Sequence, residues 1–124
     1  MIIGLGTDLC EIERIEAALA RRATLARRIL TAAELDLFQV ASDPARFLAK
    51  RFAAKEAAVK ALGTGIGRGV SWHHLCIEKT EAGRPLLRLS GTAAEIARDL
   101  GIQHWHLSYS DERHYVVAMV VAEG

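Results

Sequence analysis

Apolar and polar positions alternate with different periods along the chain, and each period predicts an element. Ile2 to Cys10 is mostly apolar around a central Gly-Leu-Gly-Thr, which predicts a short buried strand. The stretch from Glu11 to about Arg28 is rich in Ala and Leu and predicts one helix or two short ones.

Three signals for the start and end of helices follow. Thr31-Ala-Ala-Glu34 is a capping box that predicts a short helix. Asp43 before Pro44 suits a helix N-cap followed by proline at the first helical position, and Gly63 suits the C-terminal end. A helix is therefore predicted over Pro44 to Leu62. Its apolar positions predict a core face made of Phe47, Leu48, Phe52, Val59 and Leu62.

The second half of the chain predicts strands and one more helix. Leu75 to Lys79 and Leu86 to Leu89 are expected to be strands around a turn at Glu81 to Pro85. Thr92-Ala-Ala-Glu95 predicts a capped helix that stops at Gly101.

Two further strands complete the pattern. His104 to Ser110 alternates, with Trp105, Leu107 and Tyr109 on one face and His104, His106, Ser108 and Ser110 on the other. Tyr115 to Ala122 predicts a more apolar partner strand. The order strand, three helices, two strands, helix, two strands predicts an α+β domain with a largely antiparallel sheet packed with helices.

Composition limits the class of protein. A chain of 124 residues, 51% of them hydrophobic, predicts one folded domain spanning 1–124. No apolar run approaches the roughly 20 residues that span a bilayer, and the start lacks the basic region of a signal peptide. Two cysteines, Cys10 and Cys76, are too few to cross-link a secreted domain, so buried thiols in the reducing cytoplasm are predicted. The apolar runs are too short to predict membrane contact.

Charge is unevenly distributed although the net charge is only +1. Residues 14–68 carry eleven bases and five acids, whereas both flanking regions are acidic. A basic middle favours an anionic ligand or partner, but solvated helix faces also produce such runs.

Two carboxylates and a lysine are candidates for chemistry. Glu56 and Lys60 are one helical turn apart, which fits either a functional pair or an ordinary surface pair worth about 0.3–0.5 kcal/mol. Asp8 ends the first predicted strand beside two glycines, where it could reach a site or cap the next helix.

The segment Gly63-Thr-Gly-Ile-Gly-Arg-Gly69 has four glycines in seven residues. It closes a helix, whereas a dinucleotide fingerprint opens one, so that motif is excluded. Its backbone amides could face a phosphate. The alternative is a helix cap followed by a flexible loop.

These segments together resemble a known family. Ile3-Gly-Leu-Gly-Thr-Asp8, followed by Glu11-Ile-Glu-Arg-Ile15, is similar to the opening of the bacterial holo-acyl-carrier-protein synthases, of the 4′-phosphopantetheinyl transferase superfamily. Arg51 to Gly65 resembles that family's second signature, and His106 to Ser110 with Tyr115 its last strands. The resemblance covers essentially the whole chain, and three motifs in order are highly specific.

The resemblance implies a reaction and a metal site. A serine hydroxyl of an apo-acyl carrier protein would attack the β-phosphate of coenzyme A and release adenosine 3′,5′-bisphosphate, in support of fatty acid biosynthesis. Asp8 and Glu56 match the family's metal ligands, with Mg²⁺ as the expected cation. Lys60 would stabilise charge on the diphosphate, and Glu56 would assist proton removal by a bound water.

The resemblance also implies contacts with substrates. Coenzyme A would be bound by Lys60 together with Arg51, Lys55, Gly63, Thr64 and Gly65. The alternative for Arg51 and Lys55 is that each simply faces solvent. The acidic carrier protein would bind a basic first helix through Arg14, Arg21, Arg22 and Arg28. Arg14, Arg21 and Arg28 recur every seven residues, so they form one stripe if the helix continues that far.

The family assembles as trimers with active sites between subunits, so a homotrimer is expected. One departure is Asp111, where many relatives have histidine; any ligand contact of that histidine is not carried over to this chain.

Other classes of protein fit less well. A phosphohydrolase or nuclease with two metal ions would need more carboxylates than Asp8 and Glu56. A nucleic-acid-binding module is disfavoured because aromatic residues are only 6% and are not interleaved with the bases. A zinc site from His73, His74 and Cys76 fails on spacing.

Overall fold

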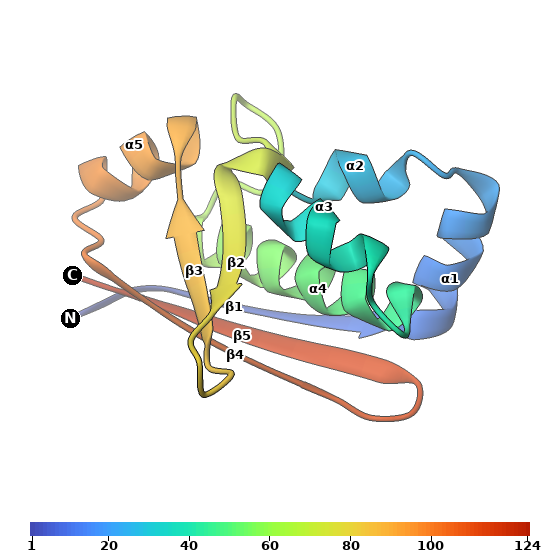
Figure 1. The fold of residues 1–124 in the computed structure, drawn as a ribbon. Coiled ribbons are helices and arrows are strands. Elements are labelled where there is room, and N and C mark those ends of the chain that lie inside the picture. The colour runs from blue at the N-terminus through green and yellow to red at the C-terminus, as the bar shows by residue number, and fades with distance from the viewer.

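A three-stranded antiparallel sheet, crossed on one face by a long helix, organises the computed structural model, which describes residues 1–124 (Figure 1). The helices and strands follow the predicted order and confirm an α+β domain. Their bounds are β1 Ile2–Glu11, α1 Ile12–Arg21, α2 Leu25–Ile29, α3 Ala32–Gln39, α4 Pro44–Leu62, a 3₁₀ turn η1 Trp72–His74, β2 Leu75–Lys79, β3 Pro85–Leu89, α5 Gly91–Asp99, β4 His104–Asp111 and β5 Tyr115–Glu123.

The sheet has the strand order β1-β5-β4, so the last strand lies between the first and β4. Alternate residues of β5 are buried against α4: Val116, Ala118, Val120 and Ala122. The predicted alternation of β4 is confirmed, because Trp105, Leu107 and Tyr109 pack on the core. The other face of the sheet carries exposed apolar side chains, among them Leu5, Leu9, Val117 and Met119.

The helix α4 lies unusually close to β1, and two glycines make this possible. A Cβ atom built on Gly4 would fall 1.9 Å from the carbonyl oxygen of Ala61, and one on Gly6 would fall 1.9 Å from that of Ala57. No side chain fits at such a separation, so glycine is required at both positions. The contact fixes the height of α4 above the strand that carries Asp8.

The predicted ends of α3 and α4 are confirmed. The side chains of Thr31 and Glu34 form the reciprocal capping box. Asp43 accepts a hydrogen bond from the amide of Arg46 at 3.2 Å, and Gly63 closes α4 with φ +84°.

The helical stretch after Glu11 takes the second of its predicted forms, two short helices, because the chain turns between Arg22 and Thr24, and α2 then packs against η1 and α3. Two other local predictions need correction. The helix α5 begins at Gly91 after Ser90, so Thr92 lies inside it rather than at the cap. Cys10 is buried as expected, but Cys76 is only half-buried; both thiols are free.

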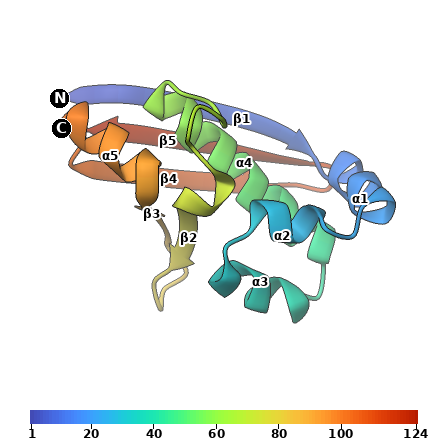
Figure 2. The ribbon, with the colours of Figure 1, turned by 90° about the horizontal axis from the view of Figure 1, so that it is seen from above.

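Smaller elements surround α4. Helices α1, α2 and α3 lie toward the end of the sheet where β1 meets α1, and the β2–β3 hairpin and α5 lie toward the end where the two termini meet (Figure 2). The amide of Gly124 donates to the carbonyl of Met1 at 2.9 Å. None of the helices combines the length and apolar character needed to cross a bilayer.

Candidate active site

Asp8, Glu56 and Lys60 come together where β1 passes beneath the C-terminal half of α4. Asp8 lies on the helix-facing side of β1, two residues after Gly6, so the close contact of strand and helix places it beside α4. The Lys60 ammonium donates to Asp8 Oδ1 at 3.2 Å and to the carbonyl of Thr7 at 2.9 Å. Lys60 therefore bridges to the strand carboxylate rather than serving only as a partner for Glu56.

A groove of about 460 Å³ opens beside these residues. Asp8 and Glu56 lie in its wall, and the remainder combines apolar side chains with Glu11 and two arginines, from β1 and three helices. The other lining residues are Leu9, Cys10, Glu11, Arg14, Ile15, Ala18, Arg21, Leu25, Ile29 and Phe52. A few polar groups among apolar walls are typical of a binding site.

The electrostatics of the groove reflect two carboxylates held close together. Burial raises the pKa of Glu56, the negative charge of Asp8 raises it further, and Lys60 opposes both effects. Burial, again with Asp8, raises the pKa of the Cys10 thiol to about 11. Cys10 is therefore a neutral thiol near neutral pH and is not a nucleophile.

The donor set fits a hard divalent cation with few protein ligands. Mutual repulsion between Asp8 and Glu56 is the kind that a shared cation relieves. The fold assembles no group of three or more His, Cys, Asp or Glu side chains suited to a metal ion. A cation here would take two carboxylates from the protein and complete its shell with water and phosphate oxygens, as Mg²⁺ commonly does.

Lys55 was expected to contact coenzyme A, and its position contradicts this. The side chain is 0% exposed, and its ammonium donates to Glu34 Oε1 at 2.6 Å, the carbonyl of Ile29 at 2.7 Å and that of Trp72 at 3.4 Å. Burial lowers the pKa of Lys55, against the opposing effect of Glu34. Three donors on three internal acceptors leave none for a phosphate.

Arg51 joins the same buried cluster. Its Nε lies 3.4 Å from Glu34 Oε2, and its guanidinium lies 4.6 Å from the ring centroid of Phe47. An edge of Arg51 also borders a second, basic groove with Arg46, Lys50 and Lys79. The Arg51 side chain is only 3% exposed, and its Nε makes no hydrogen bond although it lies within ion-pair distance of Glu34.

The glycine-rich loop begins as a helix cap. The amides of Gly63, Thr64 and Gly65 all donate to the carbonyl of Val59, at 3.0, 3.1 and 3.3 Å. These three amides therefore satisfy the end of α4, and the idea that they face a phosphate needs correction. Space is open above Gly63 and Gly65, where an added Cβ would meet nothing within 4 Å.

The predicted arginine stripe is divided. Arg14 and Arg21 of α1 both line the groove, and Arg22 lies just beyond with Arg21 around a neighbouring hollow. Arg28 belongs to α2, so the turn between the helices removes it from the line of Arg14 and Arg21. Arg14, Arg21 and Arg28 therefore do not form one continuous surface, but Arg14 and Arg21 give the groove a basic edge.

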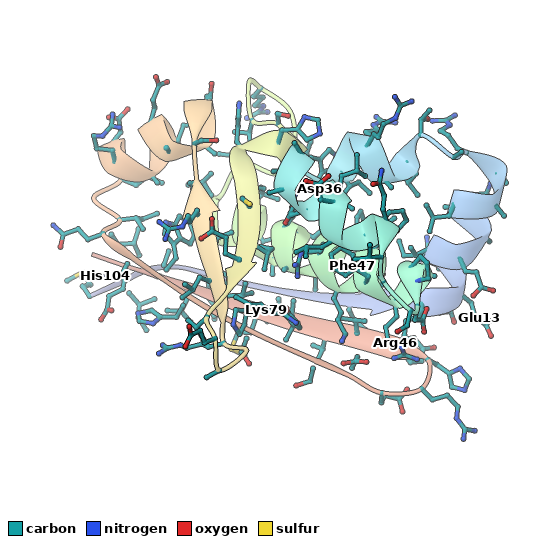
Figure 3. The ribbon with its side chains drawn as sticks, in the orientation of Figure 1. Glu13, Asp36, Arg46, Phe47, Lys79 and His104 are labelled. Carbon is teal, nitrogen blue, oxygen red and sulfur yellow. The ribbon has the colours of Figure 1, made fainter.

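Asp111 has a structural partner at the far end of α4. Arg46 donates to its carboxylate at 2.7 Å and Lys50 lies 3.3 Å from it. Partial burial opposes ionisation, but these two bases hold the pKa of Asp111 below its ordinary value. Arg46 also donates to the carbonyls of Glu112 and Arg113, so it fastens the β4–β5 turn to α4; Figure 3 shows Arg46 at this end.

Several groove residues carried no sequence signal of their own. Leu25, Ile29 and Phe52 look like ordinary core positions in an amphipathic pattern, and only the folded chain brings them together in one groove. Glu34 was predicted only as a capping residue, yet it is also the buried partner of Lys55. A carboxylate that is 1% exposed could not be foreseen from a capping motif.

Comparison with known proteins defines the class. The family described as "4'-phosphopantetheinyl transferase superfamily" matches residues 4–120 of this chain. The chain therefore belongs to this family. Within it, the chain is 60% identical over 124 residues to a holo-[acyl-carrier-protein] synthase of Vibrio cholerae, covering 99% of this chain and 98% of that protein.

Solved structures agree with the fold. The holo-[acyl-carrier-protein] synthase of Neisseria meningitidis is 42% identical with a TM-score of 0.94, and the match covers 100% of both chains. The enzyme of Helicobacter pylori in complex with coenzyme A is 32% identical with a TM-score of 0.84, covering 96% of this chain and 99% of that one. The predicted family is thereby confirmed.

Proposed function

We propose that this chain transfers the 4′-phosphopantetheine arm of coenzyme A to a serine of an apo-acyl carrier protein, in support of fatty acid biosynthesis. The observation that carries the proposal is the meeting of Asp8, Glu56 and Lys60 at the end of one groove, in a chain of this family. The serine oxygen forms a bond to the β-phosphorus, the bond from that phosphorus to the bridging oxygen breaks, and adenosine 3′,5′-bisphosphate leaves.

In this proposal Asp8 and Glu56 hold Mg²⁺, which supplies charge neutralisation for the diphosphate. Lys60 is half-exposed, so its ammonium can turn from Asp8 to a phosphate oxygen and stabilise the charge that develops there. Glu56 would also help a water accept the serine proton.

Coenzyme A would lie across the C-terminal end of α4. Lys60 would contact its diphosphate, and the open space above Gly63 and Gly65, on either side of Thr64, lets the ligand approach the backbone closely. Arg51 would take part only through the basic groove that it borders, together with Arg46 and Lys50.

The carrier protein would bind along α1 and the groove. Arg14 and Arg21 supply positive charge at the groove edge, with Arg22 and Arg28 further out, which suits an acidic partner. The apolar wall from α2 would receive apolar side chains of that partner while its serine reaches Asp8 and Glu56.

A homotrimer is part of the proposal. The outer face of the β1-β5-β4 sheet exposes Leu5, Val117 and Met119 in adjacent strands, and such an apolar face suits burial against another subunit. Arg51 of one subunit could then serve coenzyme A held by its neighbour. We expect light scattering to give a trimer mass, and Met119→Lys to give a monomer.

The reaction is assigned to the cytoplasm, where the free thiols of Cys10 and Cys76 stay reduced. The decisive test is the mass of a purified apo-acyl carrier protein after incubation with the chain, coenzyme A and Mg²⁺. A gain of one phosphopantetheine unit is expected. No gain with several carrier proteins would contradict the proposal.

A further inference from the structure

The buried cluster of Glu34 and Lys55 does more than stabilise α4. We infer that it positions the apolar wall of the carrier-binding groove, so that Lys55 and Glu34 are positioning residues for binding of the carrier protein. The inference rests on the proposed function of the groove, but its physical step, the anchoring of α2, is independent of any substrate.

Lys55 joins three separate segments at one atom. Its ammonium is bonded to Glu34 at the start of α3, to the carbonyl of Ile29 at the end of α2, and to the carbonyl of Trp72 in η1. Glu34 in turn accepts from the amides of Thr31 and Ile77, both at 2.9 Å. Through one ion pair the cluster therefore fixes α2, α3, η1 and β2 relative to α4.

The first route to the groove runs through α2. This helix has five residues, too few to be stable without external contacts. Leu25 and Ile29 of α2 line the groove opposite Glu56, and the carbonyl of Ile29 is the acceptor that Lys55 holds at 2.7 Å. The position of this wall is thus set by a bond from the residue that precedes Glu56.

A second route runs through an aromatic pair. Lys55 also donates to the carbonyl of Trp72, whose ring packs on Phe52 with 5.3 Å between centroids. Phe52 lines the same groove one turn before Glu56. Two different walls of the groove are therefore linked to one ammonium group.

The chemistry of the cluster favours positioning over stability alone. Replacing a buried ion pair by apolar side chains often leaves stability unchanged or improves it, so stability by itself does not require these charges. An ammonium, unlike an apolar side chain, fixes three acceptors at defined distances and directions. That property suits a wall that must stand at a set distance from the two carboxylates.

The test uses the double variant Glu34→Gln with Lys55→Met in the full-length protein, which avoids leaving either charge without the other. A matched control, Glu78→Gln with Arg88→Met, removes an exposed ion pair on the β2–β3 hairpin. Amide hydrogen exchange is measured without ligand. We expect residues 25–30 to exchange roughly tenfold faster in the test variant while α5 is unchanged, and the control to match the parent protein.

Kinetics with a purified apo-acyl carrier protein form the second readout. The KM for the carrier should rise about tenfold or more, because displaced contacts far from the reacting atoms can cost this much, while the KM for coenzyme A stays within about twofold. Titration of the carrier onto the enzyme without metal or coenzyme A should show the same weakening. If the double variant does not fold, Lys55→Gln alone, which leaves Glu34 beside Arg51, is judged by the same criteria.

Three outcomes are decisive. Parent-like exchange over 25–30 and a parent-like carrier KM would overturn the inference. Faster exchange in α5 as well, with both KM values raised together, would reduce the cluster to a purely structural role and also overturn it. Absence of transfer by the parent protein would instead contradict the proposed function. The hydrogen-exchange experiment would then still decide whether Lys55 anchors α2.

Discussion

Helix α4 carries lysines at positions 50, 55 and 60, each next to a carboxylate, and the last two lie in opposite surroundings. Lys55 lies 2.6 Å from Glu34, and both side chains are at most 1% exposed. Lys60 lies 3.2 Å from Asp8, and its side chain is 51% exposed. Each pair joins a lysine ammonium to a carboxylate, and the two sites differ mainly in their surroundings.

The difference lies in what remains free to bind. Every donor of the Lys55 ammonium is used inside the protein, and exchanging it for an external ligand would leave Glu34 buried without its partner. Lys60 can leave Asp8 at a smaller cost, because water solvates its half-exposed ammonium, although the Asp8 side chain is only 15% exposed. A buried pair holds the fold, whereas an open pair is available for chemistry.

The largest expected effect comes from removing a carboxylate at the open pair. Asp8→Asn and Glu56→Gln should each lower transfer by at least about 10²-fold, because a bound cation supplies several kcal/mol to the transition state. Circular dichroism and the unfolding temperature should be those of the parent. Near-normal turnover across a range of Mg²⁺ concentrations would show that these side chains are not the ligands.

The next effect belongs to the buried pair. Lys55→Met alone should destabilise the protein by about 3–5 kcal/mol, because it leaves the Glu34 carboxylate buried and short of positive charge. Denaturant unfolding measures this loss. A change below about 1 kcal/mol, as for a surface pair, would erase the contrast between the two lysines.

Lys60→Met should show the reverse behaviour. Its unfolding free energy should change by no more than a surface pair contributes, while kcat should drop about 10²-fold through loss of one preorganised charge. Lys60→Arg should restore the rate only in part, since the planar guanidinium differs in shape from an ammonium. An unchanged kcat in Lys60→Met would leave Lys60 as a surface ion pair.

The smallest effect concerns the groove edge. Reversing Arg14 and Arg21 to Glu should raise the carrier KM about tenfold, leave the KM for coenzyme A nearly unchanged, and weaken the salt dependence of the reaction. Arg28→Glu should have a smaller effect because it lies on α2, and Arg98→Glu on α5 serves as the control. Equal losses for both substrates would point to a folding defect.

Much of this arrangement could be predicted because it depends on local signals. Asp43, Pro44 and Gly63 define the ends of α4 through capping chemistry that acts within a few residues. The alternation of β4 follows from one buried and one open face of a sheet. The family motifs located Asp8, Glu56 and Lys60, which the structure then brings together.

What could not be predicted depends on contacts distant in sequence. In the sequence alone, Lys55 and Arg51 resemble solvent-facing bases. Only the fold brings the carboxylate of Glu34, about 20 positions earlier, against both of them. The turn after Arg21 interrupts a run of good helix formers, and local propensity does not decide there between one helix and two. Gly4 and Gly6 were noticed as neighbours of Asp8, but their role is visible only once α4 lies on β1.

The close contact at these two glycines also bears on motion. With the carbonyls of Ala57 and Ala61 resting directly against the strand, β1 and α4 have no soft side-chain layer between them through which to slide. Asp8 and Glu56 should therefore move together as parts of one rigid unit. Adjustment to carrier proteins of different shape would then fall to α1 and the short α2, and the spacing of the two carboxylates would stay constant from one partner to the next.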